Sequence, residues 1–229
     1  MGVVYLKYDK ETEADGAEVE KLLVAALAAV TVGGGAVAAG NLSYFQGEKV
    51  INVLDGDTFV TENRQPIRLA GLDAPELINC MGNDAKEALS TLILGKRVRL
   101  RNLKTDPFRR IMAAVYLNST LVNEVMIRAG MAQYTEYQGS EKTRLVQANN
   151  YARNTKTGIY GPECTQPEPP NSTCVIKGNY DINDRMKIYY TPTCNNYIQV
   201  IIMKSQGDEW FCTEAQARKA GFVRSDTCR

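Results

Sequence analysis

An arginine interrupts the short apolar run at residues 66–72, and this run constrains the fold more than any other stretch. Arg68 is the single charged residue in PIRLAGL. A charge in a buried strand costs several kcal/mol unless it is paired or has a function. Acidic residues flank the run at Asp57, Asp73 and Glu76. The stretch therefore predicts a site for a cation and a phosphate at the ends of two strands.

Each piece of this stretch is ordinary by itself. Residues 55–58 (DGDT) and 73–76 (DAPE) are both turn sequences, since Asp, Gly and Pro favour turns. The first is not an EF-hand loop, because Phe59 and Val60 stand where that loop needs further oxygen ligands. It is the combination of the acids with Arg68 that favours a functional site over two structural turns.

The composition of the chain excludes several classes of catalytic site. The chain has no histidine, which excludes Ser-His-Asp hydrolases, histidine-based nucleases and most catalytic zinc sites. Catalysis near neutral pH must use carboxylates, Lys, Tyr, Cys or a metal-bound water. The net charge is +1, and acids predominate before residue 40, so the remainder is mildly basic. That balance permits a nucleic-acid partner without requiring one.

The first 40 residues divide into a polar segment, residues 1–21, and an uncharged segment, residues 22–40. The second segment is just long enough to span a bilayer as a helix, although three consecutive glycines at residues 33–35 weaken it. A signal peptide is the alternative, with a cleavage pattern (AVA) at residues 36–38. A soluble alanine-rich helix should show a polar face, which this segment lacks. We therefore expect an extracytoplasmic protein that is either membrane-anchored or secreted.

Local patterns after residue 40 predict short strands and a few helices. Strands are expected at residues 47–54, 58–61, 66–72, 96–103, 111–117 and 132–134. Helices are expected after an Asn83 cap, over residues 121–129, and over residues 141–154 after Ser140. Short, mostly antiparallel strands with Gly and Asn turns fit a compact α+β barrel better than alternating βα units.

A proline-rich stretch, residues 165–172, predicts a linker between a domain at residues 45–164 and a small module at residues 173–229. In the module we expect strands at residues 187–190 and 197–203, and a helix opened by a capping box at Thr213. So small a module has little core of its own. Its four cysteines could bind zinc or form two disulfides, and export favours the disulfides.

From residue 50 to about residue 160 the sequence resembles the staphylococcal (thermonuclease-type) nuclease family. Five segments occur in the family's order: VLDGDTF (53–59), IRLAGLDAPE (67–76), TDPFRRIMAAVY (105–116), LVNEVMIRAGMA (121–132) and ARNTKTGIY (152–160). Any one of them would be weak, but five together are specific. The sequence departs from the family at Glu136 and Gln138, where a pair of tyrosines is usual, with Tyr134 and Tyr137 offset. The tail resembles a cysteine-bearing module appended to bacterial extracellular nucleases.

The resemblance implies an OB-fold, a five-stranded barrel with helices packed around it. It also implies a calcium-dependent phosphodiesterase that acts on DNA and RNA and leaves 3′-phosphate ends. Asp57 and Asp73 match the calcium-binding carboxylates, and Ala74 matches the position whose backbone carbonyl completes the protein's ligands. Calcium takes six to eight oxygen ligands, so such a set leaves places for water and a phosphate oxygen.

The same resemblance assigns the remaining charges. Glu76 matches the acid that orients or deprotonates the attacking water, and Arg68 and Arg110 match the arginines that grip the scissile phosphate. Guanidinium groups suit this role because they can hold two phosphate oxygens at once. The family's exported members imply a disulfide between Cys80 and Cys164. We expect a monomer.

A non-catalytic OB-fold nucleic-acid-binding protein is the competing interpretation, and an envelope scaffold with a vestigial nuclease domain is a third. The binding-protein interpretation predicts the loss of at least one of the five charged site residues. All five are present: Asp57, Arg68, Asp73, Glu76 and Arg110.

Overall fold

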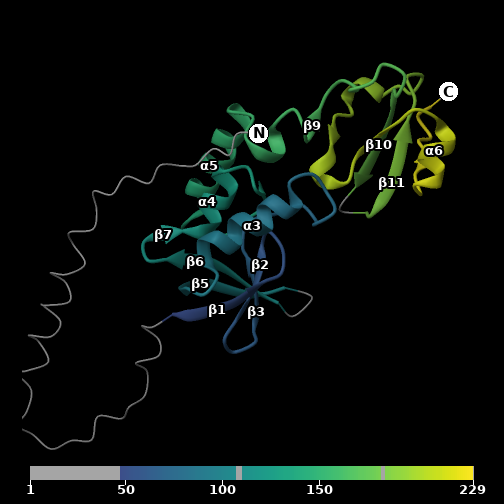
Figure 1. Cartoon of the computed structure of the whole chain (residues 1–229). Helices are drawn as coiled ribbons and strands as arrows, with labels where there is room; N and C mark the ends of the chain where they lie inside the picture. The colour runs from purple at the N-terminus through teal and green to yellow at the C-terminus, as the bar shows by residue number, and fades with distance from the viewer. Residues whose placement is uncertain (1–46, 107–109, 182–183, 229) are drawn as a thin grey trace, which may run out of the picture. The chain divides into compact units, whose positions relative to one another are not determined.

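Five strands form the framework of the N-terminal part of the described structure (Figure 1). The computed structural model describes residues 47–106, 110–181 and 184–228, which belong to one compact unit. The five strands are β1 (Glu48–Val53), β2 (Thr58–Thr61), β3 (Pro66–Leu69), β5 (Arg97–Thr105) and β6 (Ile111–Leu117). Turn residues between the strands explain why the sequence pattern predicts most of their bounds closely.

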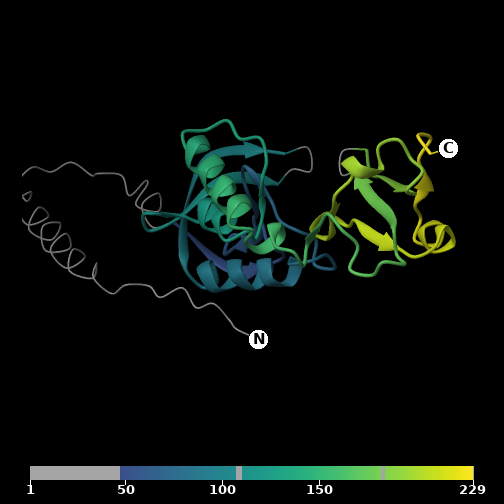
Figure 2. The same ribbon diagram turned by 90° about the horizontal axis from the view of Figure 1, so that it is seen from above.

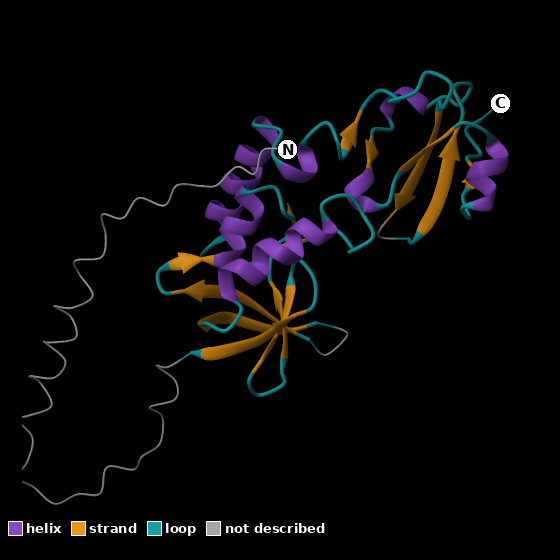
Figure 3. Cartoon of the chain, in the orientation of Figure 1, coloured by secondary structure: helices purple, strands orange, loops and turns teal. Residues whose placement is uncertain are grey.

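The sheet closes on itself. The pairs β1–β2, β2–β3, β1–β5 and β5–β6 are antiparallel. The short strand β7 (Thr120–Leu121) is also paired antiparallel with β6. The parallel pair β3–β6 joins the two ends of this series, with Ile67 opposite Ile111 and Leu69 opposite Ala113. Closure removes the free strand edges of an open sheet. The expected OB-fold barrel is confirmed, and Figure 3 shows its strands crossing in a tight group beside the helices.

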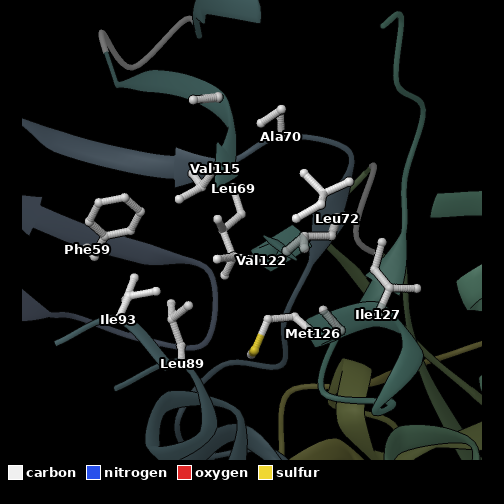
Figure 4. Close-up of a cluster of buried hydrophobic side chains, with 14 of the residues drawn as sticks. Phe59, Leu69, Ala70, Leu72, Leu89, Ile93, Val115, Val122, Met126 and Ile127 are labelled. Atoms are coloured by element: carbon white, nitrogen blue, oxygen red, sulfur yellow. The ribbon is translucent and has the colours of Figure 1, made fainter. Parts of the chain in front are cut away.

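Three helices pack against the barrel: α3 (Gly82–Ile93), α4 (Val122–Arg128) and α5 (Lys142–Asn154). On α3 the residues Ala85, Leu89 and Ile93 follow helical spacing, and all three are fully buried. They share one hydrophobic core with barrel side chains. Figure 4 shows Leu89 and Ile93 near Phe59 of β2, with Leu69 of β3 in the same cluster. The core thus fixes α3 over the strands that carry the charged residues.

Two helices begin differently from the sequence expectation. Helix α3 begins at Gly82, and the cap position is Met81 with φ 67°, so Asn83 is not the cap. A Cβ on Gly82 would lie 2.0 Å from the Glu76 carbonyl oxygen, so the chain turns too tightly there for a side chain. Helix α5 begins after Glu141, which forms no side-chain cap, rather than after Ser140.

The run at residues 66–72 is two strands instead of one. Strand β3 ends at Leu69, and β4 (Leu72–Asp73) pairs with β8 (Gln133–Tyr134). Gly71 between them has φ 76°, and a Cβ there would lie 2.8 Å from the Cβ of Tyr137. A left-handed residue ends the extended conformation. The break places Asp73 on a separate short strand.

The C-terminal part forms a second sheet with its own small core. Its elements are β10 (Ile176–Asp181), β11 (Met186–Tyr190), β13 (Glu209–Phe211), β14 (Val223–Arg224) and α6 (Glu214–Lys219). Helix α6 packs against β10 and β13. Figures 1 and 2 show this helix in yellow beside the strands of the C-terminal part. The expected capping box is present, because Gln216 N donates to Thr213 Oγ1 and the Gln216 side chain accepts from the Thr213 backbone. Phe211 and Phe222 meet edge to face, with ring centroids 5.1 Å apart.

Disulfides connect all the module's cysteines, in the pairs Cys174–Cys212 and Cys194–Cys228. These thiols are therefore not available as zinc ligands, and of the two alternatives that the sequence leaves open the disulfides are confirmed. The links close short loops in a module whose buried core is small.

The expected strand at residues 197–203 is wrong over most of its length. Residues Tyr197–Gln199 form the 3₁₀ helix η2, and within the expected range only β12 (Ile202–Met203) is a paired strand, followed by η3 (Lys204–Gln206). The buried ammonium of Lys177 explains the turn, because it donates to the carbonyl oxygens of Tyr197 and Val200 at 3.0 and 2.5 Å. A tertiary hydrogen-bond donor of this kind overrides local β-propensity.

Backbone hydrogen bonds join the module to the barrel part and to the residues that follow it. Strand β9 (Thr165–Gln166), at the start of the expected linker, pairs with β12. Cys164, next to β9 and after the 3₁₀ helix η1 (Gly158–Tyr160), forms a disulfide with Cys80, with the Cα atoms 5.7 Å apart. Lys204 N donates to Cys164 O at 2.8 Å, and Cys80 N donates to Lys204 O at 3.3 Å.

The polar segment at residues 1–21 and the apolar segment at residues 22–40 lie outside the described residues, together with the expectations of a membrane anchor or signal peptide. Within the ranges that the structure does describe, no helix combines the length and the apolar character needed to cross a membrane.

Replacing both Cys80 and Cys164 by serine should lower the free energy of unfolding by about 4 kcal/mol, because the bond closes a loop of 84 residues. Urea unfolding of the variant and the native protein under non-reducing conditions measures the difference. Peptide mapping of the variant serves as the control by confirming that Cys174–Cys212 and Cys194–Cys228 are intact. Equal unfolding free energies would contradict the prediction.

Candidate active site

The turn between β1 and β2 presents the first acid of the site. Asp55 Oδ1 accepts hydrogen bonds from the backbone nitrogens of Asp57 and Thr58 at 3.0 and 2.7 Å, which closes the turn locally. A Cβ on Gly56 would lie 2.6 Å from Ala85 Cβ and 2.7 Å from Ala74 Cβ. The glycine therefore lets the turn press against both the α3 helix and the second acidic turn.

Arg68 lies between two carboxylates. Its Nη1 donates to Asp57 Oδ1 at 2.5 Å, and its Nη2 donates to Asp73 Oδ1. The Arg68 side chain is 17% exposed, against 3% for Asp57 and 34% for Asp73. The charge inside the apolar run is thus compensated twice, which satisfies the requirement that a buried charge be paired.

Asp57 is the most deeply buried of the site acids. Besides Arg68, its carboxylate accepts from Thr58 Oγ1 at 2.8 Å and from Ala74 N at 3.0 Å. Burial raises the pKa of Asp57 from 3.8 to about 7, and the nearby charge of Asp55 adds to the rise. The guanidinium of Arg68 and the two other donors oppose it. A carboxylate that is costly to ionise favours the binding of positive charge.

Glu76 lies on the turn after β4. Its side chain is exposed, and its backbone oxygen accepts from Asn79 N at 2.8 Å. Asp73, Ala74 and Glu76 line the same cavity, which has a volume of about 390 Å³. Glu76 is therefore an accessible carboxylate in the same cavity as Asp73, which is paired with Arg68.

Arg110 is positioned by its own acid. Its Nε donates to Asp106 Oδ2 at 2.7 Å and its backbone nitrogen to Asp106 Oδ1 at 2.8 Å. In the parallel pair β3–β6, Arg68 lies opposite Met112. Because side chains alternate along a strand, Arg110, two residues before Met112, lies on the same face of the sheet as Arg68. Arg110 does not line the Glu76 cavity.

The structure brings together most of the residues that the sequence singles out. Asp57, Arg68 and Asp73 are in direct contact, and Ala74 is hydrogen-bonded to Asp57. Glu76 joins them through the shared cavity. Sequence reasoning missed the module residues that line this cavity, which are Tyr180, Arg185, Ser205 and Gln206. They lie over a hundred residues further along the chain, and no local pattern marks them.

The offset tyrosines do not form an open stacking surface. Tyr137 is 6% exposed, and its hydroxyl donates to Glu141 Oε2 at 2.8 Å and accepts from Asn102 Nδ2 at 3.0 Å. Burial raises the pKa of Tyr137 to about 12. Glu136 and Gln138 are exposed instead. Stacking of a base on two tyrosines is not available at these positions.

The donor set fits a hard cation. Asp57 and Asp73 both direct an oxygen at one positive group, the Arg68 guanidinium, so the two carboxylates converge. Two converging carboxylates are a minimal protein contribution to a calcium site, in which water and substrate complete the ligands. The described part of the chain has no group of three or more His, Cys, Asp or Glu side chains arranged to hold a metal.

Comparison with known proteins gives several related matches. Residues 66–161 match the protein family described as "Staphylococcal nuclease homologue". An Escherichia coli protein named "Uncharacterized endonuclease" is 35% identical over 127 residues, which are 53% of this chain and 80% of the relative. The "Micrococcal nuclease" of Shigella flexneri is 31% identical over 137 residues, 54% of this chain and 78% of the relative.

A plant protein, the "Probable staphylococcal-like nuclease CAN1" of Oryza sativa subsp. japonica, is 30% identical over 112 residues, 48% of this chain and 33% of the relative. The bacterial matches cover most of each relative, and the family match spans the strand of Arg68, the Asp73 turn and Arg110. The barrel has the closed five-stranded form that this resemblance implies. The chain belongs to the staphylococcal nuclease family.

Proposed function

We propose that this protein is a calcium-dependent nuclease that hydrolyses phosphodiester bonds of DNA, RNA or both and leaves 3′-phosphate ends. The observation that carries the proposal is the convergence of Asp57 and Asp73 on the Arg68 guanidinium, beside the exposed Glu76. Family membership supports nucleic acid as the substrate class.

Asp57, Asp73 and the Ala74 carbonyl would hold the calcium ion. Bound calcium would supply positive charge to a phosphodiester that is already anionic. Asp57 contributes the buried part of this site, and hydrogen bonds from Thr58 and Ala74 fix the direction of its oxygens. Asp73 contributes the more exposed part, since its side chain is 34% exposed.

Arg68 and Arg110 bind the scissile phosphate in this proposal. Arg68 donates one N–H of Nη1 to Asp57 and one N–H of Nη2 to Asp73. A guanidinium has five N–H groups in all, so these two hydrogen bonds leave three for a phosphate. Arg110 is oriented by Asp106 through Nε, which holds its guanidinium plane in a fixed direction. Two arginines on one face of the sheet stabilise the extra negative charge that the phosphorus centre gains during attack.

Glu76 acts as the base. Its exposed carboxylate lines the cavity next to Asp73, where a water can lie between it and a phosphate. It orients the water and accepts its proton as the oxygen attacks phosphorus. The bond to the 5′-oxygen then breaks, the 5′-oxygen takes up a proton from solvent water to leave as a hydroxyl, and the phosphate stays on the 3′-oxygen.

We also propose an extracytoplasmic, monomeric protein that is anchored through residues 22–40 or secreted. Three disulfides support this location, because they persist in oxidising compartments. An envelope scaffold or a non-catalytic binding protein would share this location but not the catalytic acid and arginines.

Activity in a gel that contains DNA separates the enzyme from these alternatives. The purified chain should clear the gel in calcium, and excess chelator should abolish the clearing, since the carboxylate pair then lacks its cation. The Glu76→Gln variant should clear the gel far less because it cannot accept the water's proton. No chelator-sensitive clearing by the native chain would contradict the proposed function.

Arg110→Ala should lower kcat by at least about a hundredfold, because phosphate-binding arginines in comparable transfers contribute about 10³ to 10⁵ in rate. Initial rates on DNA measure the effect, and circular dichroism reports the fold. Arg144→Ala is a matched control, since Arg144 is also paired with an acid, Glu124, but on the surface. A variant at position 110 that retains near-native turnover would contradict the assignment.

In the presence of chelator, the native protein should lose stability relative to Asp57→Asn as the pH rises from about 4 to 7. Burial raises the pKa of Asp57 to about 7 in the folded state, against 3.8 for the ordinary group in the unfolded chain. The folded state binds more protons in this window, so a rising pH favours unfolding, and Asn lacks this effect. Melting temperatures across the window test it, with exposed Glu76→Gln as the acid-to-amide control. Parallel curves for native protein and Asp57→Asn would be the contrary result.

A further inference from the structure

The C-terminal module contributes one wall of the cavity that contains the site acids. From the barrel part, Asp73, Ala74 and Glu76 line it, and from the module Tyr180, Arg185 and Gln206 do. A second cavity of about 400 Å³ shares Asp73, Gln133, Tyr180 and Gln206 with the first. Through these shared residues the two cavities together run from Glu76 of the barrel part to residues of the module.

Direct hydrogen bonds hold this wall in place. Gln206 Nε2 donates to Gln133 Oε1 at 2.9 Å, and Gln133 lies opposite Asp73 in the β4–β8 pair. Asn79, three residues after Glu76, donates from Nδ2 to Ser205 O at 3.3 Å. The segment at residues 205–206 is therefore attached to both ends of the acidic turn. The Cys80–Cys164 disulfide lies beside these contacts in the sequence.

The module's own packing orients Tyr180 towards this cavity. The carboxylate of Asp208 is 1% exposed and accepts hydrogen bonds from Tyr180 N at 2.7 Å and Met203 N at 2.9 Å. Asn179 Nδ2 donates to the same carboxylate at 3.1 Å. A buried acid thus ties strand β10 to the β12 segment that contacts the barrel part. Tyr180 lines both cavities from this position.

Arg185 supplies positive charge opposite the acids. It lies on the β10–β11 connection, is exposed, and lines the first cavity together with Asp73 and Glu76. Among the described residues it has no hydrogen-bond or ion-pair partner, although two carboxylates line the same cavity. An arginine that forms no ion pair with a neighbouring acid is suited to bind a phosphate, because two of its N–H groups can donate to the phosphate at once.

We propose that Tyr180 of β10 and Arg185, just before β11, form a substrate-binding wall for a nucleic-acid strand, in which Arg185 binds a phosphate next to the scissile one. Tyr180 packs against the adjoining sugar or base. This inference rests on the proposed nuclease function and adds a binding subsite to it. It also supplies an aromatic contact to the substrate in a chain whose Tyr137 is buried away from solvent.

A wall beyond the scissile phosphate makes binding depend on strand length. A strand of about 12 nucleotides can reach both Glu76 and Arg185, while a dinucleotide can occupy only one phosphate position. The module should therefore strengthen the binding of longer strands without changing the chemical step. The expected signature is a rise in KM with kcat unchanged when Arg185 is replaced.

The test uses full-length protein with Glu76→Gln, so that a fluorescent single-stranded DNA of about 12 nucleotides can bind without being cut. Adding Arg185→Gln should weaken binding about tenfold, as expected for a lost hydrogen bond to a charged group. The slope of log affinity against log salt should fall by about 0.7, the value for one single-strand phosphate contact. Tyr180→Ala should weaken binding with no change in that slope.

Arg218→Ala is the matched control, because Arg218 belongs to the same module but is paired with Glu214. It should leave the affinity and the salt slope unchanged. In the otherwise native chain, Arg185→Gln should raise KM for the long strand and leave cleavage of a dinucleotide as it was.

The outcomes separate the two claims. If the native chain cleaves DNA in calcium but Arg185→Gln binds with the native affinity and slope, the binding wall is wrong and the nuclease function stands. Tighter binding by Arg185→Gln would also overturn it, since Arg185 would then obstruct the strand. If the native chain neither binds nor cleaves nucleic acid, the proposed function itself fails.

Discussion

Arg68 donates to Asp57 and Asp73 at once, and this double ion pair joins the β1–β2 turn to the strands β3 and β4. Asp57 immediately precedes β2, and burial makes its charge costly, which is why its pKa rises to about 7 even beside a guanidinium. Removing the arginine would leave two converging carboxylates with no positive charge between them. The convergence of the two carboxylates, which suits a bound cation, is therefore also what makes Arg68 necessary.

Two glycines make this arrangement possible. Gly56 allows the first acidic turn to approach Ala74 and Ala85, and Gly82 allows α3 to begin against the Glu76 carbonyl. Both are close approaches of backbone that a Cβ would prevent. Helix α3 in turn is held by its buried face in the barrel core, so the position of Glu76 depends on hydrophobic packing as much as on polar contacts.

Local chemistry explains which parts of this structure could be predicted. The barrel strands and the Thr213 capping box follow from patterns within a few residues. The roles of the five charged site residues, which come from motif matches, stay predictions. The expectations that failed depend on distant contacts. Asn83 loses the cap because α3 begins against Glu76, and residues 197–203 bend around the Lys177 ammonium. Such contacts have no signature in a short window of sequence.

The sequence predicts the C-terminal module, but no sequence pattern indicates that its residues line the cavity beside Asp73 and Glu76. Its attachment is redundant, because the β9–β12 pair, the backbone hydrogen bonds of Lys204 with Cys80 and Cys164, and the side-chain hydrogen bonds of Asn79 and Gln206 all connect it to the barrel part. A tether alone would need only the covalent link. Contacts aimed at the acidic turn itself restrict where the module can lie, and a restricted wall loses less entropy when a strand binds. This pre-organisation favours a module that binds substrate over a module that is only tethered to the barrel part.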